Sequence, residues 1–134
     1  MKPKISQLLL IITILTVTLS CKKEAGIGGS STIKGSVYAK YYDKTFTILN
    51  GEGWSQEQDV YIIYGNGSTY DDHVRTNYDG TFEFRYLEKG HYKVYLYSKD
   101  STLTIPSGQF PVFREVEITK NHATIEIPKF DIFN

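Results

Sequence analysis

Side chains able to perform catalysis are few in this sequence, and they follow no recognisable motif. The three histidines, His73, His91 and His122, do not have the close spacing of paired metal ligands. Cys21 is the only cysteine, so an internal disulfide is excluded. The sequence has neither a Gly-x-Ser-x-Gly nucleophile elbow nor a phosphate-binding glycine loop. We therefore predict no catalytic residues and no cofactor.

A cluster of oxygen-bearing side chains raises the question of a calcium site. Asp71, Asp72 and Asp79 lie near Asn77 in the sequence, and calcium takes several oxygen ligands. Their spacing differs from that of an EF-hand loop, which is fixed. We favour the alternative that these residues form turns and keep the surface solvated, and we predict no metal ligands.

Aromatic residues on two expected strands are the better candidates for binding. Successive side chains of a strand point to opposite faces. If the aliphatic residues between them face the core, then Tyr61 and Ile63 face outward, and so do Tyr95 and Tyr97. Together with Trp54, the only tryptophan, they would form a hydrophobic face suited to a sugar ring or to another protein. This face is the predicted binding site.

The elements that must position these residues are strands. From Thr32 onward the sequence is rich in Tyr, Phe, Val, Ile and Thr, and apolar residues alternate with polar ones between Gly, Asn and Asp turns. No window keeps helical spacing for long. The pattern predicts an all-β fold, an antiparallel Greek-key β-sandwich of about seven strands. Expected strands include 33–40, 59–64, 81–86, 91–97 and a last hairpin that pairs 112–118 with 123–127.

The N-terminus has a different character from the rest of the chain. Lys2 and Lys4 precede an apolar stretch, 8–19, which is too short for a membrane-spanning helix and is typical of a signal peptide. Ser20 and Cys21 follow it, and the arrangement resembles a bacterial lipoprotein signal. Because Thr18 stands where that family usually has Leu, an ordinary signal peptide remains the alternative.

The lipoprotein resemblance implies both a location and a division of the chain. Residues 1–20 would be removed, and Cys21 would carry lipid that holds the protein to the membrane, as two or three acyl chains can. Segment 21–31 is rich in Gly and Ser, which predicts a flexible tether to a domain over 32–134. Its charged start is similar to the surface-export segment of Bacteroidota lipoproteins. We expect a cell-envelope protein, in the outer membrane, that is periplasmic or surface-exposed.

Charge excludes one class of partner. The chain has 15 basic and 15 acidic residues, and loss of the signal removes two lysines and no acid. The remaining domain is slightly acidic, so no nucleic-acid partner is expected.

A second resemblance rests on motifs in the domain itself. Four segments occur in the order found in the carboxypeptidase regulatory-like domain, a transthyretin-like sandwich. They are Gly35-Ser36-Val37, 59–62, 76–84 with its Asp79-Gly80 turn, and 87–94. The sequence resembles that family over about residues 32–128. The resemblance implies a non-catalytic accessory or binding module.

The main departure from that family is the segment 42–58, which replaces a brief connection. It contains Trp54, and it would form either an extra hairpin or a loop folded over one end of the sandwich. This segment, or residues 130–133 at the C-terminal end, could also cover the predicted binding face.

Two functions are compatible with these features. The first is a lipid-anchored structural or interaction module that holds another envelope protein through the face formed by Tyr61, Ile63, Tyr95 and Tyr97. The second is a carbohydrate-binding lipoprotein whose exposed Tyr and Trp residues stack on glycan. A broad apolar face favours a protein partner, whereas exposed rings beside carboxylates or amides favour glycan.

Overall fold

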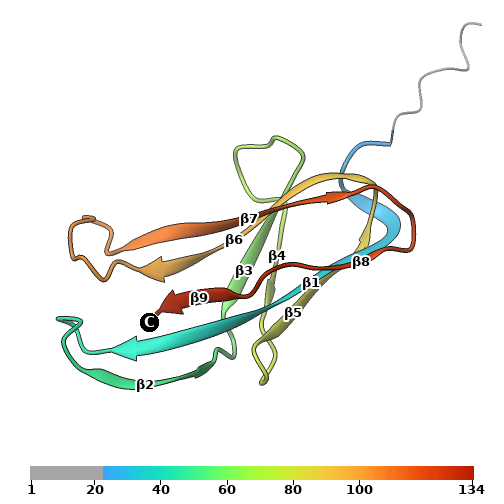
Figure 1. Ribbon diagram of the computed structural model, residues 1–134. Helices are drawn as coiled ribbons and strands as arrows, with labels where there is room; N and C mark the ends of the chain where they lie inside the picture. Colours follow the sequence, from blue (N-terminus) through green and yellow to red (C-terminus); the bar gives the residue numbers. More distant parts are fainter. Residues whose placement is uncertain (1–22) are drawn as a thin grey trace, which may run out of the picture.

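Residues 23–134 are described by the computed structural model, and they form two facing β-sheets (Figure 1). The predicted all-β sandwich is confirmed, with nine strands rather than about seven. Residues 23–134 contain no helix, and so none that could cross a membrane. The predicted signal peptide and the predicted lipidation site, Cys21, lie outside the described residues. The strands are β1 Ile27–Tyr42, β2 Leu49–Trp54, β3 Asp59–Tyr64, β4 Asp72–Arg75, β5 Thr81–Leu87, β6 Gly90–Lys99, β7 Gln109–Ile118, β8 Thr124–Glu126 and β9 Phe130–Phe133.

One sheet of five strands is built on β1. The first half of β1 pairs with β5 on one side and with β8 on the other, whereas its second half pairs with β2 and β9. The pairings with β2 and β5 are antiparallel, and those with β8 and β9 are parallel. Within the 16 residues of β1, those from Ser31 to Ala39 alternate strictly between buried and half-exposed, because only one face of the sheet packs on the core.

β1 begins at Ile27, so it includes the last five residues, 27–31, of the segment predicted to be a flexible tether. Ser31 is buried, and its hydroxyl donates to the carbonyl of Lys120 at 3.0 Å. The glycines have a packing role instead, since a Cβ atom on Gly29 would lie 2.1 Å from the carbonyl oxygen of Leu87. The tether prediction is therefore wrong for 27–31, and the folded domain extends at least to Ile27.

The second sheet has four strands in the order β4-β3-β6-β7, all antiparallel. β7 pairs with β6 along ten residues, from Gln109 to Ile118. The predicted hairpin between 112–118 and 123–127 is wrong, because the chain crosses to the other sheet after β7 and β8 joins β1. A hydrogen bond just before β8 supports its pairing with β1, because the N–H of Thr32 donates to the carbonyl of Ala123 at 2.8 Å.

The core lies between the two sheets. Phe82, Phe84 and Leu87 of β5 are buried there as the sequence predicts, and Gly35 lets the ring of Phe82 approach, since a Cβ atom on Gly35 would lie 2.7 Å from it. Segment 42–58 forms the β1–β2 hairpin, which is one of the two forms predicted for it. The other fully buried members are Ile33, Val37, Ala39, Val60, Ile62, Tyr92, Val94, Leu96, Ile118 and Phe130.

Substitution of Gly29 tests whether residues 27–31 are part of a paired strand or of a flexible tether. Gly29→Ala should lower the free energy of unfolding by about 1–3 kcal/mol, because the new methyl group meets the backbone at Leu87. Gly51→Ala is the matched control, since nothing lies within 4 Å of a Cβ atom there. Urea unfolding of both variants measures the difference. Equal stability of Gly29→Ala and the wild type would contradict the strand pairing at this position.

Candidate functional site

Four aromatic rings cross the outer face of the four-stranded sheet in one line. His73 of β4 lies opposite Tyr61 of β3, Tyr61 opposite Tyr95 of β6, and Tyr95 opposite Phe113 of β7. Successive ring centroids are 5.9, 5.2 and 5.1 Å apart. We call these four residues the aromatic row. Cross-strand aromatic pairs of this kind stabilise a sheet and fix the orientation of the rings.

Two further tyrosines extend the aromatic row into a broader face. Tyr70, from the β3–β4 loop, packs on Tyr61 with a centroid distance of 5.0 Å. Tyr97 lies 5.8 Å from Tyr95 and 6.1 Å from Tyr61. Tyr95 is 8% exposed and forms the floor, whereas Tyr70, Tyr97 and Phe113 are 51%, 39% and 46% exposed. Together with the aromatic row, Tyr70 and Tyr97 make up what we call the aromatic face.

The hydroxyl groups of Tyr61 and Tyr95 stay protonated at neutral pH. Desolvation, followed by the negative charge of Asp59, raises the pKa of Tyr61 above its ordinary value. Desolvation also raises the pKa of Tyr95. Both phenols therefore keep their hydrogen-bond donors.

The structure brings together three of the five residues predicted for the binding face. Tyr61, Tyr95 and Tyr97 share the outer face of one sheet. Ile63 points to the same side but is only 6% exposed, because the β3–β4 loop packs against it near Gly67. Trp54 belongs to β2 in the other sheet and takes no part in the face. The prediction of one face containing all five is therefore wrong for Ile63 and Trp54.

A polar hollow borders the aromatic face. It measures about 300 Å³ and lies between Tyr61 and Tyr97 on one side and the end of β9 on the other. Asp59 lines it and is held by Arg75, whose Nε donates to the carboxylate at 3.0 Å. The remaining lining residues are Gln58, Lys99, Gln109 and Asn134. Amide and charged groups thus flank the aromatic rings.

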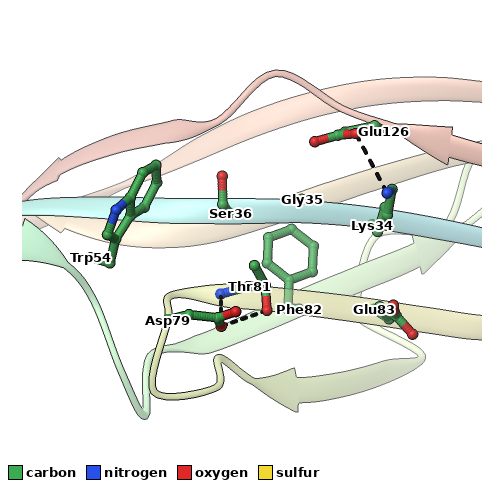
Figure 2. Close-up of a pocket in the computed structure, with 9 residues that line it drawn as sticks. All are labelled: Lys34, Gly35, Ser36, Trp54, Asp79, Thr81, Phe82, Glu83 and Glu126. Atoms are coloured by element: carbon green, nitrogen blue, oxygen red, sulfur yellow. Dashed lines mark hydrogen bonds and ion pairs between the residues drawn. The ribbon is translucent and has the colours of Figure 1, made fainter.

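Trp54 stands on the outer face of the five-stranded sheet. It is 52% exposed and contacts Tyr38 of β1 edge to face, at 5.3 Å and 88°. Figure 2 shows Trp54 at one end of a hollow of about 290 Å³ and the Lys34–Glu126 ion pair at the other. This hollow, like the one beside Tyr97, has the size and side chains for a small ligand.

A six-residue motif, Asp-x-Thr-x-Thr-Ile, occurs twice and was missed by the sequence analysis. At 43–48 it forms the tip of the β1–β2 hairpin. The Asp43 carboxylate accepts hydrogen bonds from the N–H groups of Thr45, Thr47 and Ile48 at 2.8–3.3 Å. The hydroxyl of Thr45, then the N–H of Ile48, hold the pKa of Asp43 well below its usual range.

The second copy, 100–105, has the same conformation at the tip of the β6–β7 hairpin. Asp100 accepts from the N–H groups of Thr102, Thr104 and Ile105 at 2.8–2.9 Å. The hydroxyl of Thr102 is the main cause that lowers its pKa. Both hairpins point to the same end of the sandwich (Figure 1). The repeated hexapeptide was the signal that could have identified these loops from sequence.

The acidic residues considered for calcium do not converge. Asp71 accepts from the N–H of Tyr64 at 2.7 Å, whereas Asp79 accepts from the N–H and hydroxyl of Thr81 in a different turn. Those contacts with Thr81 lower the pKa of Asp79. Within residues 23–134 no group of three or more His, Cys, Asp or Glu side chains is placed to hold a metal ion.

Neither models of known protein families nor the curated proteins match this sequence. Among solved structures, the chain is similar to the crystal structure of an (S)-allantoin synthase, with 12% sequence identity and a TM-score of 0.40. The likeness covers 81% of this chain and 44% of that one, so this chain spans less than half of it. Such a distant similarity supports no argument about activity.

The two Asp-x-Thr-x-Thr-Ile loops predict how the free energy of unfolding changes at low pH. The unfolded pKa of Asp is about 3.9, and both folded values lie below it, so the stabilisation is present above about pH 4 and is lost at lower pH. The double variant Asp43→Asn/Asp100→Asn should be less stable than the wild type at pH 7. It should also lose less stability on further acidification.

Urea unfolding at neutral pH and at about pH 3 tests this expectation. Glu52→Gln, an exposed substitution on β2, serves as the control and should keep the acid dependence of the wild type. An unchanged acid dependence in the double variant would show that the two carboxylates do not contribute as their hydrogen bonds indicate.

Proposed function

We propose that this protein is a lipid-anchored, non-catalytic module of the bacterial cell envelope that binds a partner protein through the aromatic face. The anchor part of the proposal is supported by the sequence around Cys21. The module part is supported by the likeness of its motifs to the carboxypeptidase regulatory-like, transthyretin-like domains. The outer membrane is the proposed location.

The aromatic face is the observation that carries the binding proposal. Large apolar side chains that remain exposed in one contiguous group mark interaction surfaces, and Tyr is enriched among residues that dominate binding energy. The aromatic row crosses four strands, a width of about 14 Å at the usual strand spacing. This breadth suits a protein surface better than a single small ligand.

Preorganisation adds to the case for binding. Each exposed ring of the aromatic face packs against at least one other, for example Phe113 on Tyr95 and Tyr70 on Tyr61. A partner that docks on rings already held in place loses less side-chain entropy. The buried ring of Tyr95 contacts both Tyr97 and Phe113, so these two exposed rings share one support.

The alternative function, carbohydrate binding, is supported by a different observation. Trp54 and the hollow beside it lie on the opposite sheet, so glycan binding and protein binding would use separate faces. The two proposals therefore have independent tests.

Substitution of exposed rings tests the protein-binding proposal. We expect Tyr97→Ser/Phe113→Ser to remove capture of a specific partner by the tagged full-length chain from solubilised envelope, since these exposed rings would be lost. Tyr78→Ser is the matched control, because Tyr78 is 87% exposed in the β4–β5 turn, outside the aromatic face. A partner that binds all three forms equally would contradict the proposal.

A single substitution tests the anchor. Cys21→Ser should move the protein from the membrane fraction to the soluble fraction, because acyl chains could no longer be attached and each buried methylene contributes about 0.8 kcal/mol to membrane binding. Ser20→Ala is a control that retains the thiol. Unchanged fractionation of Cys21→Ser would refute lipid anchoring.

A further inference from the structure

The hollow beside Trp54 has the dimensions of a small ligand site. Its volume of about 290 Å³ is at the lower end of the roughly 300–1,000 Å³ typical of small-molecule sites. It lies on the outer face of the five-stranded sheet, on the side facing away from the core (Figure 2). The residues around it come from four strands and one turn: Lys34, Gly35, Ser36, Trp54, Asp79, Thr81, Phe82, Glu83 and Glu126.

The backbone around Trp54 is rigid although the indole itself is exposed. The next residue, Ser55, is buried, and its N–H donates to the carbonyl of Val37 at 2.9 Å. Its carbonyl accepts the hydroxyl of Thr76 at 2.5 Å. Gly80 approaches so closely that a Cβ atom there would lie 3.0 Å from the Cβ atom of Trp54. The indole is therefore preorganised, with about half of its surface open to solvent.

The floor of the hollow carries small hydroxyl side chains. Ser36 of β1 and Thr81 of β5 lie directly opposite each other. The Thr81 hydroxyl donates to the Asp79 carboxylate at 2.6 Å and accepts from the Asn77 amide at 3.2 Å, which leaves one of its lone pairs for a ligand. Short side chains here leave room for a ring that stands against Trp54.

The far end of the hollow is charged. Lys34 of β1 lies between Glu83 of β5 and Glu126 of β8 in the strand register, and its Nζ is 3.5 Å from a Glu126 carboxylate oxygen. Its side chain is 42% exposed and that of Glu126 is 72% exposed. Both donors and acceptors are thus accessible within the same hollow.

We propose that this hollow binds one ring of a glycan that consists of neutral or amino sugars. A sugar ring has an apolar C–H face, which fits the flat indole, and a rim of hydroxyl groups, which need both donors and acceptors. The hollow is lined by three carboxylates, from Asp79, Glu83 and Glu126, and by the cation of Lys34. Lys34 pairs with Glu126, and Arg85 pairs with Glu83 at 2.7 Å, so the unbalanced negative charge of the lining is that of Asp79. This charge disfavours phosphates and acidic sugars. The inference rests on the alternative function, carbohydrate binding, and deepens it by naming the site and the class of sugar.

The lone tryptophan provides a direct readout. Because Trp54 is the only tryptophan in the chain, its fluorescence reports on this hollow alone. We expect a panel of neutral and amino-sugar oligosaccharides to contain one that shifts the emission saturably, with a dissociation constant of about 1 mM or lower. Matched oligosaccharides that carry uronic acids or phosphate should bind more weakly.

Variants locate the binding and check the fold. The sugar affinity of each full-length variant is measured by calorimetry. Trp54→Ala should weaken sugar binding at least about tenfold, because a central aromatic anchor is lost. Glu83→Gln keeps the indole and should weaken binding less. Tyr97→Ser/Phe113→Ser should bind sugar normally, even if it captures no protein. A thermal melt checks that each variant is folded.

Three results would overturn the proposal. The first is the absence of any fluorescence change with the whole panel at concentrations of about 10 mM. The second is unaltered sugar affinity in both Trp54→Ala and Glu83→Gln. The third is tighter binding of the acidic sugars than of the neutral ones. Failure of partner capture by the aromatic face would leave these measurements unaffected, so the two proposals fail separately.

Discussion

Hydrogen bonding to β1 is the constraint on which the five-stranded sheet depends. β2, β5, β8 and β9 each pair with β1 and with no other strand of the described residues. Its polar face carries Lys34, between residues of β5 and β8, and Ser36, opposite Thr81 of β5. Its buried face carries Ile33 and Val37 into the core. The same backbone that organises the core therefore also assembles the Trp54 hollow.

The two outer faces of the sandwich have contrasting chemistry. On the four-stranded sheet, rings pack on rings, and Tyr95 is buried by its neighbours in the aromatic row. On the five-stranded sheet, a single exposed indole borders hydroxyl and charged groups. Because the sheets face opposite directions, one molecule can present both surfaces without either blocking the other.

The sequence predicted those features that follow from local alternation. Buried Phe82 and Phe84, and the outward direction of Tyr61, Tyr95 and Tyr97, follow from a period of two along a strand. Strand partners do not, because pairing joins residues far apart in sequence. The last predicted hairpin failed for this reason, and so did the placement of Trp54 beside the tyrosines.

Two further predictions from local sequence were wrong, the flexible tether at 27–31 and the exposure of Ile63. Glycines at 28 and 29 indicate flexibility by composition, yet in the folded chain Gly29 permits close contact with Leu87 and Glu88, and Gly28 adopts a positive φ of 111°. Ile63 follows the alternation rule, but a loop covers it, and the path of a loop cannot be read from a strand pattern.

The parallel pairing of β1 with β9 has a mechanical consequence. Tension between residues 27 and 133 pulls these two strands along their length, so their hydrogen bonds are loaded in shear and must rupture together.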